Sequence, residues 1–375
     1  MTSCPDDEEE GGLDRPRREA GAEAARVLAL CNVCNYCNGY CELFRAAERY
    51  QRFDDGTVAY LANLCHQCRN CWYACQYADP HPFAVNLPRA LAEARLLSWR
   101  RRAWPAPLPR PALVAALLAL LPPLLCLLLV PPDRLFAAHQ GPGAFYAVIP
   151  WGVMSLAAAL PLGLSALALG VGVARFWRAL PPAAAPDSGA AMRRRAWAAA
   201  LADLVALRNL QGGGGGCTDR DERFSHARRR LHHLLVAGVG LCFLATAVAT
   251  LYHHALGWPA PYPLTSLPVL SGTLGGVAMV AAALGLLALR IGADPAPTTP
   301  AARPGDRLLL GQILATALSG LALLALRDGP LMGILLALHL GTVVSLFALL
   351  PFGKFAHAPY RACALLRAAL DRQQP

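Results

Sequence analysis

The chain carries one cysteine spacing twice, as CNVCNYCNGYC at residues 31–41 and CHQCRNCWYAC at residues 65–75. Each run reads Cys-x2-Cys-x2-Cys-x3-Cys, and together they hold eight of the thirteen cysteines. Three thiolates at this spacing can wrap one cube of iron and sulfide, and in two-cluster ferredoxins the fourth cysteine ligates the other cube. The spacing therefore predicts two [4Fe–4S] clusters. We expect the first on Cys31, Cys34, Cys37 and Cys75, and the second on Cys65, Cys68, Cys71 and Cys41.

Two other uses of clustered cysteines fit this pattern less well. Zinc takes four ligands, commonly as two Cys-x2-Cys pairs, and the third cysteine of each run has no place in such a site. A disulfide framework is typical of small secreted domains, and we read no cleavable signal peptide before the first run. Proline commonly follows the fourth cysteine in bacterial ferredoxins, whereas Glu42 and Gln76 stand there. This departure concerns the local turn and not the ligands.

The composition points to a membrane protein. Of 375 residues, 55% are hydrophobic and only 15% are charged. This balance is too apolar for a soluble protein of this size and indicates membrane spans. The net charge of +10 would suit nucleic acid only with a basic face on a recognisable binding fold, and the sequence offers neither. We therefore expect a lipid bilayer as partner and no nucleic acid.

Six apolar stretches follow the cysteines, each close to the roughly 20 residues that cross a bilayer as a helix. They lie at about 113–130, 149–173, 234–251, 267–289, 308–326 and 331–350. Prolines in the first two, among them Pro122 and Pro161, predict kinks that membrane helices tolerate. The sequence thus predicts an α-helical polytopic membrane protein with an N-terminal, bacterial-type two-[4Fe–4S] ferredoxin-like domain.

These features divide the chain into four parts. We expect a disordered acidic tail at 1–24, the cluster domain at 25–100, the membrane domain at 108–357 with a long loop at 174–233, and a C-terminal tail at 358–375. The long loop holds eleven arginines, whereas the loops on the opposite side hold only Arg134 and Arg327. Because positively charged loops stay in the cytoplasm, both termini and the clusters are predicted to be cytoplasmic.

A glycine run at residues 212–216 interrupts the long loop. No strand is predicted before it and no Gly-Lys-Ser/Thr follows, so a phosphate-binding loop is disfavoured. A loop whose backbone approaches another segment closely is the better interpretation.

Histidines in and beside the spans form a second candidate site. His339 lies inside the sixth span, where an ionisable residue indicates a function by default. His357 follows 18 residues later, which is five turns of a continuous helix and places both on one face. The ends of the third span carry His232, His233, His253 and His254.

Antiparallel helices would bring these histidines together in two pairs. His253 or His254 would lie level with His339, and His232 or His233 level with His357. Each pair could ligate a b-type haem axially, in the way that helical bundles hold cofactors between facing helices. The alternative is that the histidines at span ends are ordinary interfacial residues. Whether one haem or two is bound stays open.

Several motifs resemble the tricarballylate/citrate-utilisation protein B family. They are Cys65-His66-Gln67-Cys68, Cys75-Gln76-Tyr77, His232-His233-Leu234, Tyr252-His253, Gly257 to Pro263 and Gly353-Lys354-Phe355, within a resemblance that covers about residues 25 to 370. The last span with His339, and His357 after it, is also similar to the haem-bearing membrane subunit of respiratory nitrate reductase.

The resemblance implies an electron-transfer protein of the bacterial inner membrane. It would take electrons from an FAD-dependent dehydrogenase of tricarballylate, or a related carboxylate, and pass them through two clusters and haem to quinone. The sequence shows no dinucleotide-binding fingerprint and no acid–base constellation. We therefore expect the flavin on a separate chain and no catalytic residue here. A reverse relay from quinol to a partner enzyme and a carboxylate transporter are the alternatives, the latter disfavoured because no two spans repeat.

Overall fold

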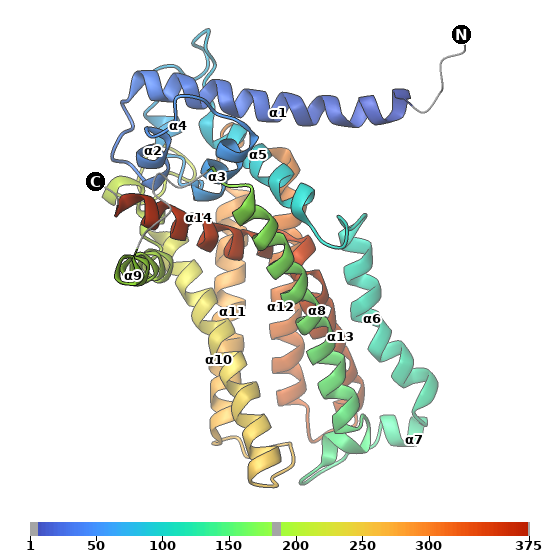
Figure 1. The fold of residues 1–375 in the computed structure, drawn as a ribbon. Helices are drawn as coiled ribbons and strands as arrows, with labels where there is room; N and C mark the ends of the chain where they lie inside the picture. The colour runs from blue at the N-terminus through green and yellow to red at the C-terminus, as the bar shows by residue number, and fades with distance from the viewer. Residues whose placement is uncertain (1–6, 182–188, 374–375) are drawn as a thin grey trace.

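The structure, a computed structural model, describes residues 7–181 and 189–373, and it is built from helices (Figure 1). Within these residues, extended structure is limited to one bridge between Cys217 and Ser225. A cysteine-bearing domain of mostly short helices sits on a bundle of six long apolar helices. The fold class predicted from the sequence is confirmed.

Five helices form the cysteine-bearing domain: α1 (Asp7–Cys34), α2 (Glu42–Ala47), α3 (Asp55–Leu64), α4 (Asn70–Tyr73) and α5 (Leu87–Arg102). Asp54 is the N-cap residue of α3: its carboxylate accepts a hydrogen bond from the Thr57 N–H at 2.8 Å, which satisfies one of the free backbone donors at the start of the helix. Tyr60, Leu61 and Leu91 are fully buried where α3 packs on α5. This local core fixes the loops that carry the cysteines.

Helix α1 begins earlier than the composition predicts. We expect a disordered tail over residues 1–24; residues 1–6 lie outside the described part of the chain, and from Asp7 onward the structure is helical. The described side chains explain the second half: Ala24, Val27 and Leu28 are fully buried against the domain. Ala20, Ala22, Ala24 and Ala25 favour helix in this second half, whereas Gly11, Gly12 and Pro16 in the first half do not account for its extension to Asp7.

The six long helices are α6 (Pro111–Leu129), α8 (Trp151–Arg178), α10 (Ala227–Ala255), α11 (Leu267–Ile291), α12 (Arg303–Ala325) and α13 (Met332–Leu349). Their length and hydropathy suit membrane spans. Large apolar side chains point outward along them, such as Leu128 and Leu129, which are 80% and 76% exposed. Outward leucines along a helix of this length face lipid rather than water. The chain is a multi-pass membrane protein.

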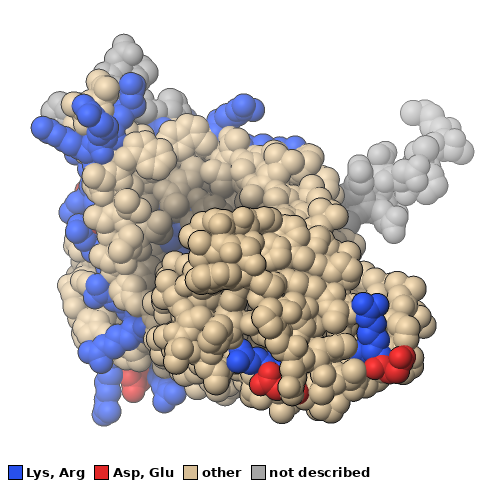
Figure 2. All heavy atoms as spheres, turned by 90° about the horizontal axis from the view of Figure 1, so that it is seen from below, with Lys and Arg blue, Asp and Glu red and all other residues tan. Residues whose placement is uncertain are grey.

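The two ends of the bundle differ. The cysteine-bearing domain, α9 (Ala190–Ala206) and α14 (His357–Arg372) lie at one end, and α7 (Pro132–Leu135) lies at the other (Figure 1). Seen from the α7 end, the near face shows few charged side chains (Figure 2). The loops there hold only Arg134 and Arg327 among basic residues. The arginine-rich loop, the cysteines and the C-terminal helix therefore share one side of the bundle.

The end of α13 contradicts one sequence argument. A helix running from His339 to His357 was the condition for placing both on one face, but α13 ends at Leu349. Two short 3-10 turns, Leu350–Phe352 and Lys354–Ala356, follow, and α14 then crosses the end of the bundle (Figure 1). Pro351 and the extended Gly353 between these turns interrupt the helix. The C-terminal segment expected as a tail is this packed helix, with Tyr360 and Leu365 buried.

Candidate functional site: two cysteine sets and a histidine pair

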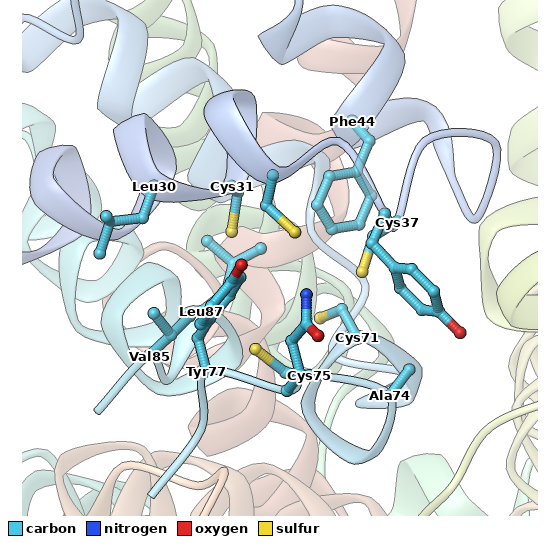
Figure 3. A pocket seen from close by; sticks show the side chains of 13 residues that line it. Leu30, Cys31, Cys37, Phe44, Cys71, Ala74, Cys75, Tyr77, Val85 and Leu87 are labelled. Atoms are coloured by element: carbon cyan, nitrogen blue, oxygen red, sulfur yellow. The ribbon is translucent and has the colours of Figure 1, made fainter. Parts of the chain in front are cut away.

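The four cysteines predicted to hold the first cluster, called here the first set, surround a pocket of the cysteine-bearing domain. Cys31 and Cys34 lie on the last turn of α1, Cys37 follows in the next loop, and Cys75 comes just after α4. Figure 3 shows the sulfurs of Cys31, Cys37 and Cys75 around this pocket, together with that of Cys71 from the second run, and its walls include Leu30, Phe44, Tyr77, Val85 and Leu87. The structure thus brings together the residues predicted for the first cluster, in largely apolar surroundings.

The four cysteines predicted to hold the second cluster, called here the second set, lie at or near the ends of the short helices α2, α3 and α4. Cys41 directly precedes α2, Cys65 directly follows α3, Cys68 lies in the next loop and Cys71 lies on α4. Burial raises the pKa of the Cys41 thiol well above its usual value, and the charges of Cys68 and Cys65 add to the rise. The fourth cysteine of the first run therefore lies among the cysteines of the second.

Cys75 shows the reciprocal placement. Burial, together with smaller contributions from the charges of Cys37, Cys75 and Cys34, raises the pKa of the Cys31 thiol to about 12. Each fourth cysteine is thus a neighbour of the other run, as crossed ligation in two-cluster ferredoxins requires. A bound cation beside thiols so crowded would favour their thiolate form.

The cysteines fit iron–sulfur cubes better than the two alternatives. The twelve cysteines within the described ranges are free thiols, so no disulfide framework is formed there. Within the same ranges, no three His, Cys, Asp or Glu side chains lie close enough to hold one metal ion. Zinc would need four sulfurs at bonds of about 2.3 Å from a single centre. Sulfurs spread around a pocket suit a cube that takes one thiolate at each iron.

Three arginines surround the loop of the second set. Arg95 Nη1 donates to the Cys65 carbonyl oxygen at 2.6 Å, and Arg361 Nη2 donates to the same oxygen at 2.9 Å. Arg228 Nη1 donates to the Gln67 carbonyl oxygen at 2.6 Å. Arg95 lies on α5 of the same domain, whereas Arg361 on α14 and Arg228 on α10 tie the cysteine-bearing domain to the end of the bundle. Sequence reasoning missed them, because arginines that bind backbone carbonyls leave no local motif.

The glycine run of the long loop also contacts the second set. Asn70 Nδ2 donates to the carbonyl oxygens of Gly212 at 2.6 Å and Gly216 at 3.0 Å. A Cβ on Gly212 would collide with the Asn70 side-chain amide, and the residue has φ of +46°. The Thr218 N–H donates to the Cys68 carbonyl oxygen at 3.0 Å. The predicted close backbone approach is confirmed, and its partner is the cysteine loop.

The inner histidines meet. The rings of His232 on α10 and His357 on α14 have centroids 6.2 Å apart. His357 Nδ1 donates to the Lys354 carbonyl oxygen at 2.6 Å, which leaves Nε2 for a ligand. His233 turns away, with Nε2 at 2.9 Å from the Val205 carbonyl oxygen. The structure therefore selects His232 over His233 as the neighbour of His357.

The inner pair fits an iron between two imidazoles. Metal–nitrogen bonds of about 2 Å on either side would separate the two ring centroids by roughly 6 Å, which matches the observed 6.2 Å. A carbonyl acceptor on the far nitrogen, as Lys354 supplies, fixes the tautomer and ring orientation of a ligating histidine.

The outer histidines are placed differently. His339 Nδ1 lies 3.1 Å from Ser319 Oγ, and the ring lies against Gly320, where a Cβ would be 2.9 Å from its Cε1. His253 stacks on Trp151 at 4.9 Å, and His254 meets the same ring edge-on at 4.7 Å. The polar groups of His339 are thus partly satisfied by α12, whereas His253 contacts Trp151 and Tyr146 and His254 contacts Trp151. Within the described residues no ring contact or hydrogen bond joins His339 to His253 or His254, so the predicted outer pair is not brought together as the inner pair is.

Comparisons with known proteins agree with these features. The family model described as "Citrate utilization protein B" matches residues 106–375, and the model "Citrate utilization protein B Fer4-like domain" matches residues 24–101. The Escherichia coli protein named "Citrate utilization protein B" is 41% identical over 362 residues, which cover 95% of this chain and 94% of that protein. No solved structure matches. A Fer4-like domain with eight cysteines suggests two [4Fe–4S] clusters.

Proposed function

Because the chain belongs to the citrate utilization protein B family, we propose that it conducts electrons from a flavoprotein dehydrogenase to membrane quinone. Two [4Fe–4S] clusters and at least one b-type haem would form the conductor. The observation that carries the proposal is the placement of the second cysteine set. Its loop is held by Arg228 and Arg361, one helical turn from His232 and His357 on the same two helices.

The residues divide into three tasks. Eight thiolates would bind the two clusters, which supply one-electron redox chemistry. His232 and His357 would bind a haem at the end of the bundle that lies against the cysteine-bearing domain. His339, inside α13, is the candidate for a second haem nearer the opposite end. Together these sites would lead from the water-exposed domain into the bilayer.

The orientation that we propose follows the arginines. Arginine-rich segments stay on the cytoplasmic side of a membrane, and here they lie at the end that carries the cysteines. Dehydrogenases of soluble carboxylates act in the same compartment as their substrates. We therefore propose that the clusters face the cytoplasm, where a separate FAD-dependent dehydrogenase of tricarballylate, citrate-related or similar carboxylates would deliver electrons.

The experiment that tests this function is a cofactor analysis of anaerobically purified full-length protein. Two clusters predict about eight non-haem irons and a similar amount of acid-labile sulfide per chain, together with the spectrum of low-spin haem. Cys68→Ser should lower iron and sulfide, whereas the control Cys242→Ser, in the membrane helix α10, should not. Stoichiometric zinc without labile sulfide would contradict the proposal.

A further inference from the structure

The two cysteine sets lie in different electrical surroundings. At the first set, Val33 and Tyr36, between the cysteines of its run, are 85% and 63% exposed. The rim of this set therefore lies at the protein surface, and no arginine or lysine hydrogen-bonds to the backbone of residues 31–37 in the described parts of the chain.

The second set lies over a layer of cations. Arg95 is 4% exposed and donates to the carbonyl oxygens of Ala62 at 3.3 Å and Cys65 at 2.6 Å. Arg361 donates to the Cys65 carbonyl oxygen at 2.9 Å, and Arg228 to those of Gln67 at 2.6 Å and His66 at 3.2 Å. Three guanidinium groups thus converge on one short loop.

Acidic groups offset only part of this charge. Asp219 Oδ1 lies 3.6 Å from Arg228 Nη1. Asp306 is shared by Lys354, at 2.9 Å, and Arg290. No ion pair joins Arg95 or Arg361 to an acidic residue among the described parts of the chain. An excess of positive charge therefore remains beside the second set.

Net charge, hydrogen bonding and exposure set the reduction potential of a [4Fe–4S] cluster. A cluster gains negative charge when it is reduced, so nearby cations stabilise the reduced form. We propose that Arg95, Arg228 and Arg361 make the second cluster the higher-potential one, so that the first cluster is the electron entry and the second is the exit. This inference rests on the proposed function and assigns an order to its two clusters.

The same arginines also position the exit. Arg228 and His232 are four residues apart on α10, and His357 and Arg361 are four residues apart on α14. Four residues rise about 6 Å along a helix. The reduced second cluster would pass one electron to the haem proposed between His232 and His357. This transfer neither forms nor breaks a bond, and it moves no proton. Arg95, Arg228 and Arg361 are positioning residues, because they act on the cluster and are not its ligands.

The test is a potentiometric titration of full-length protein, followed by electron paramagnetic resonance. Wild-type protein should show two one-electron cluster components, and Cys34→Ser should lose the lower one. Arg95→Gln and Arg361→Gln should each make the upper component at least tenfold harder to reduce, which is about 59 mV for one electron. Arg95→Lys, which keeps the charge, should stay near wild type. The matched control is Arg89→Gln on the same helix, an exposed arginine paired with Glu93.

Two results would overturn the inference. One is loss of the upper component in Cys34→Ser, which would make the first cluster the stronger acceptor. The other is an upper component that Arg95→Gln and Arg361→Gln leave unmoved, or that shifts together with the lower one. If both glutamine variants lose the second cluster, the order found with Cys34→Ser decides alone. Wild-type protein without any cluster signal would instead refute the proposed function.

Discussion

Replacement of either inner histidine by alanine tests the haem site most directly. The rings of His232 and His357 have centroids 6.2 Å apart and planes tilted by 58°, and in the proposed site one iron would take one bond from each. His232→Ala or His357→Ala would leave that iron with a single axial imidazole. We expect either variant to abolish the same low-spin component of the reduced haem spectrum completely, and we expect the double variant to lose nothing further.

The size of this effect follows from the geometry. A neighbour that only orients a ligand typically changes metal affinity 10- to 100-fold when it is lost, which leaves a weakened but detectable site. Loss of the ligand itself removes the bis-imidazole state altogether. Non-additivity in the double variant would show that the two histidines act as one unit. His339 belongs to a separate site in α13, so any component that depends on it should persist.

The matched control is the next residue along the chain. His233→Ala removes an imidazole whose Nε2 lies 2.9 Å from the Val205 carbonyl oxygen and which faces α9 rather than His357. It should keep the full spectrum of dithionite-reduced membranes. If His233→Ala lost the component and His232→Ala kept it, the selection of His232 would be refuted. If His357→Ala kept it as well, this pair would be no haem site.

Two further predictions concern orientation and stability. A reporter fused after Asp371 should be cytoplasmic and one inserted within residues 257–265 external; the reverse pattern would place the clusters outside. Asp306→Asn should lower the unfolding free energy by roughly 1–3 kcal/mol, because the buried Asp306 carboxylate is the shared counter-charge of Lys354 and of Arg290, whose side chain is 35% exposed. Thermal unfolding of the full-length protein in detergent measures this change. The control is Asp328→Asn, which removes a 70% exposed carboxylate paired with Arg327 and should cost less than about 1 kcal/mol.

The sequence predicts those parts of the fold that depend on local pattern. A run of about 20 apolar residues can be satisfied in lipid only as a helix, so all six predicted spans overlap the observed helices α6, α8, α10, α11, α12 and α13. The cysteine spacing is equally local, since three thiolates at i, i+3 and i+6 can reach one cube without help from distant residues. The structure accordingly brings Cys31 near Cys75 and Cys41 near Cys65.

The helical arithmetic fails where the helix ends. Counting five turns from His339 to His357 assumes a continuous helix, and the turns around Pro351 and Gly353 break it after Leu349. His357 still meets His232, because α14 crosses the bundle at the level where α10 begins. That crossing depends on tertiary packing of buried residues such as Tyr360 and Leu365, which no period in the sequence encodes.

The arginines show why the missed part of the site matters. A cysteine loop and a histidine pair on separate domains would have a distance set by a soft domain interface. Here Arg228 and Arg361 bind the backbone of that loop, and each is four residues from a histidine on its own helix. An α-helix is stiff over one turn, with a rise of about 6 Å. The separation between the second cluster and the histidine pair is therefore fixed by helix geometry on two sides, and movement of the cysteine-bearing domain would have to break these hydrogen bonds before it could lengthen the electron path.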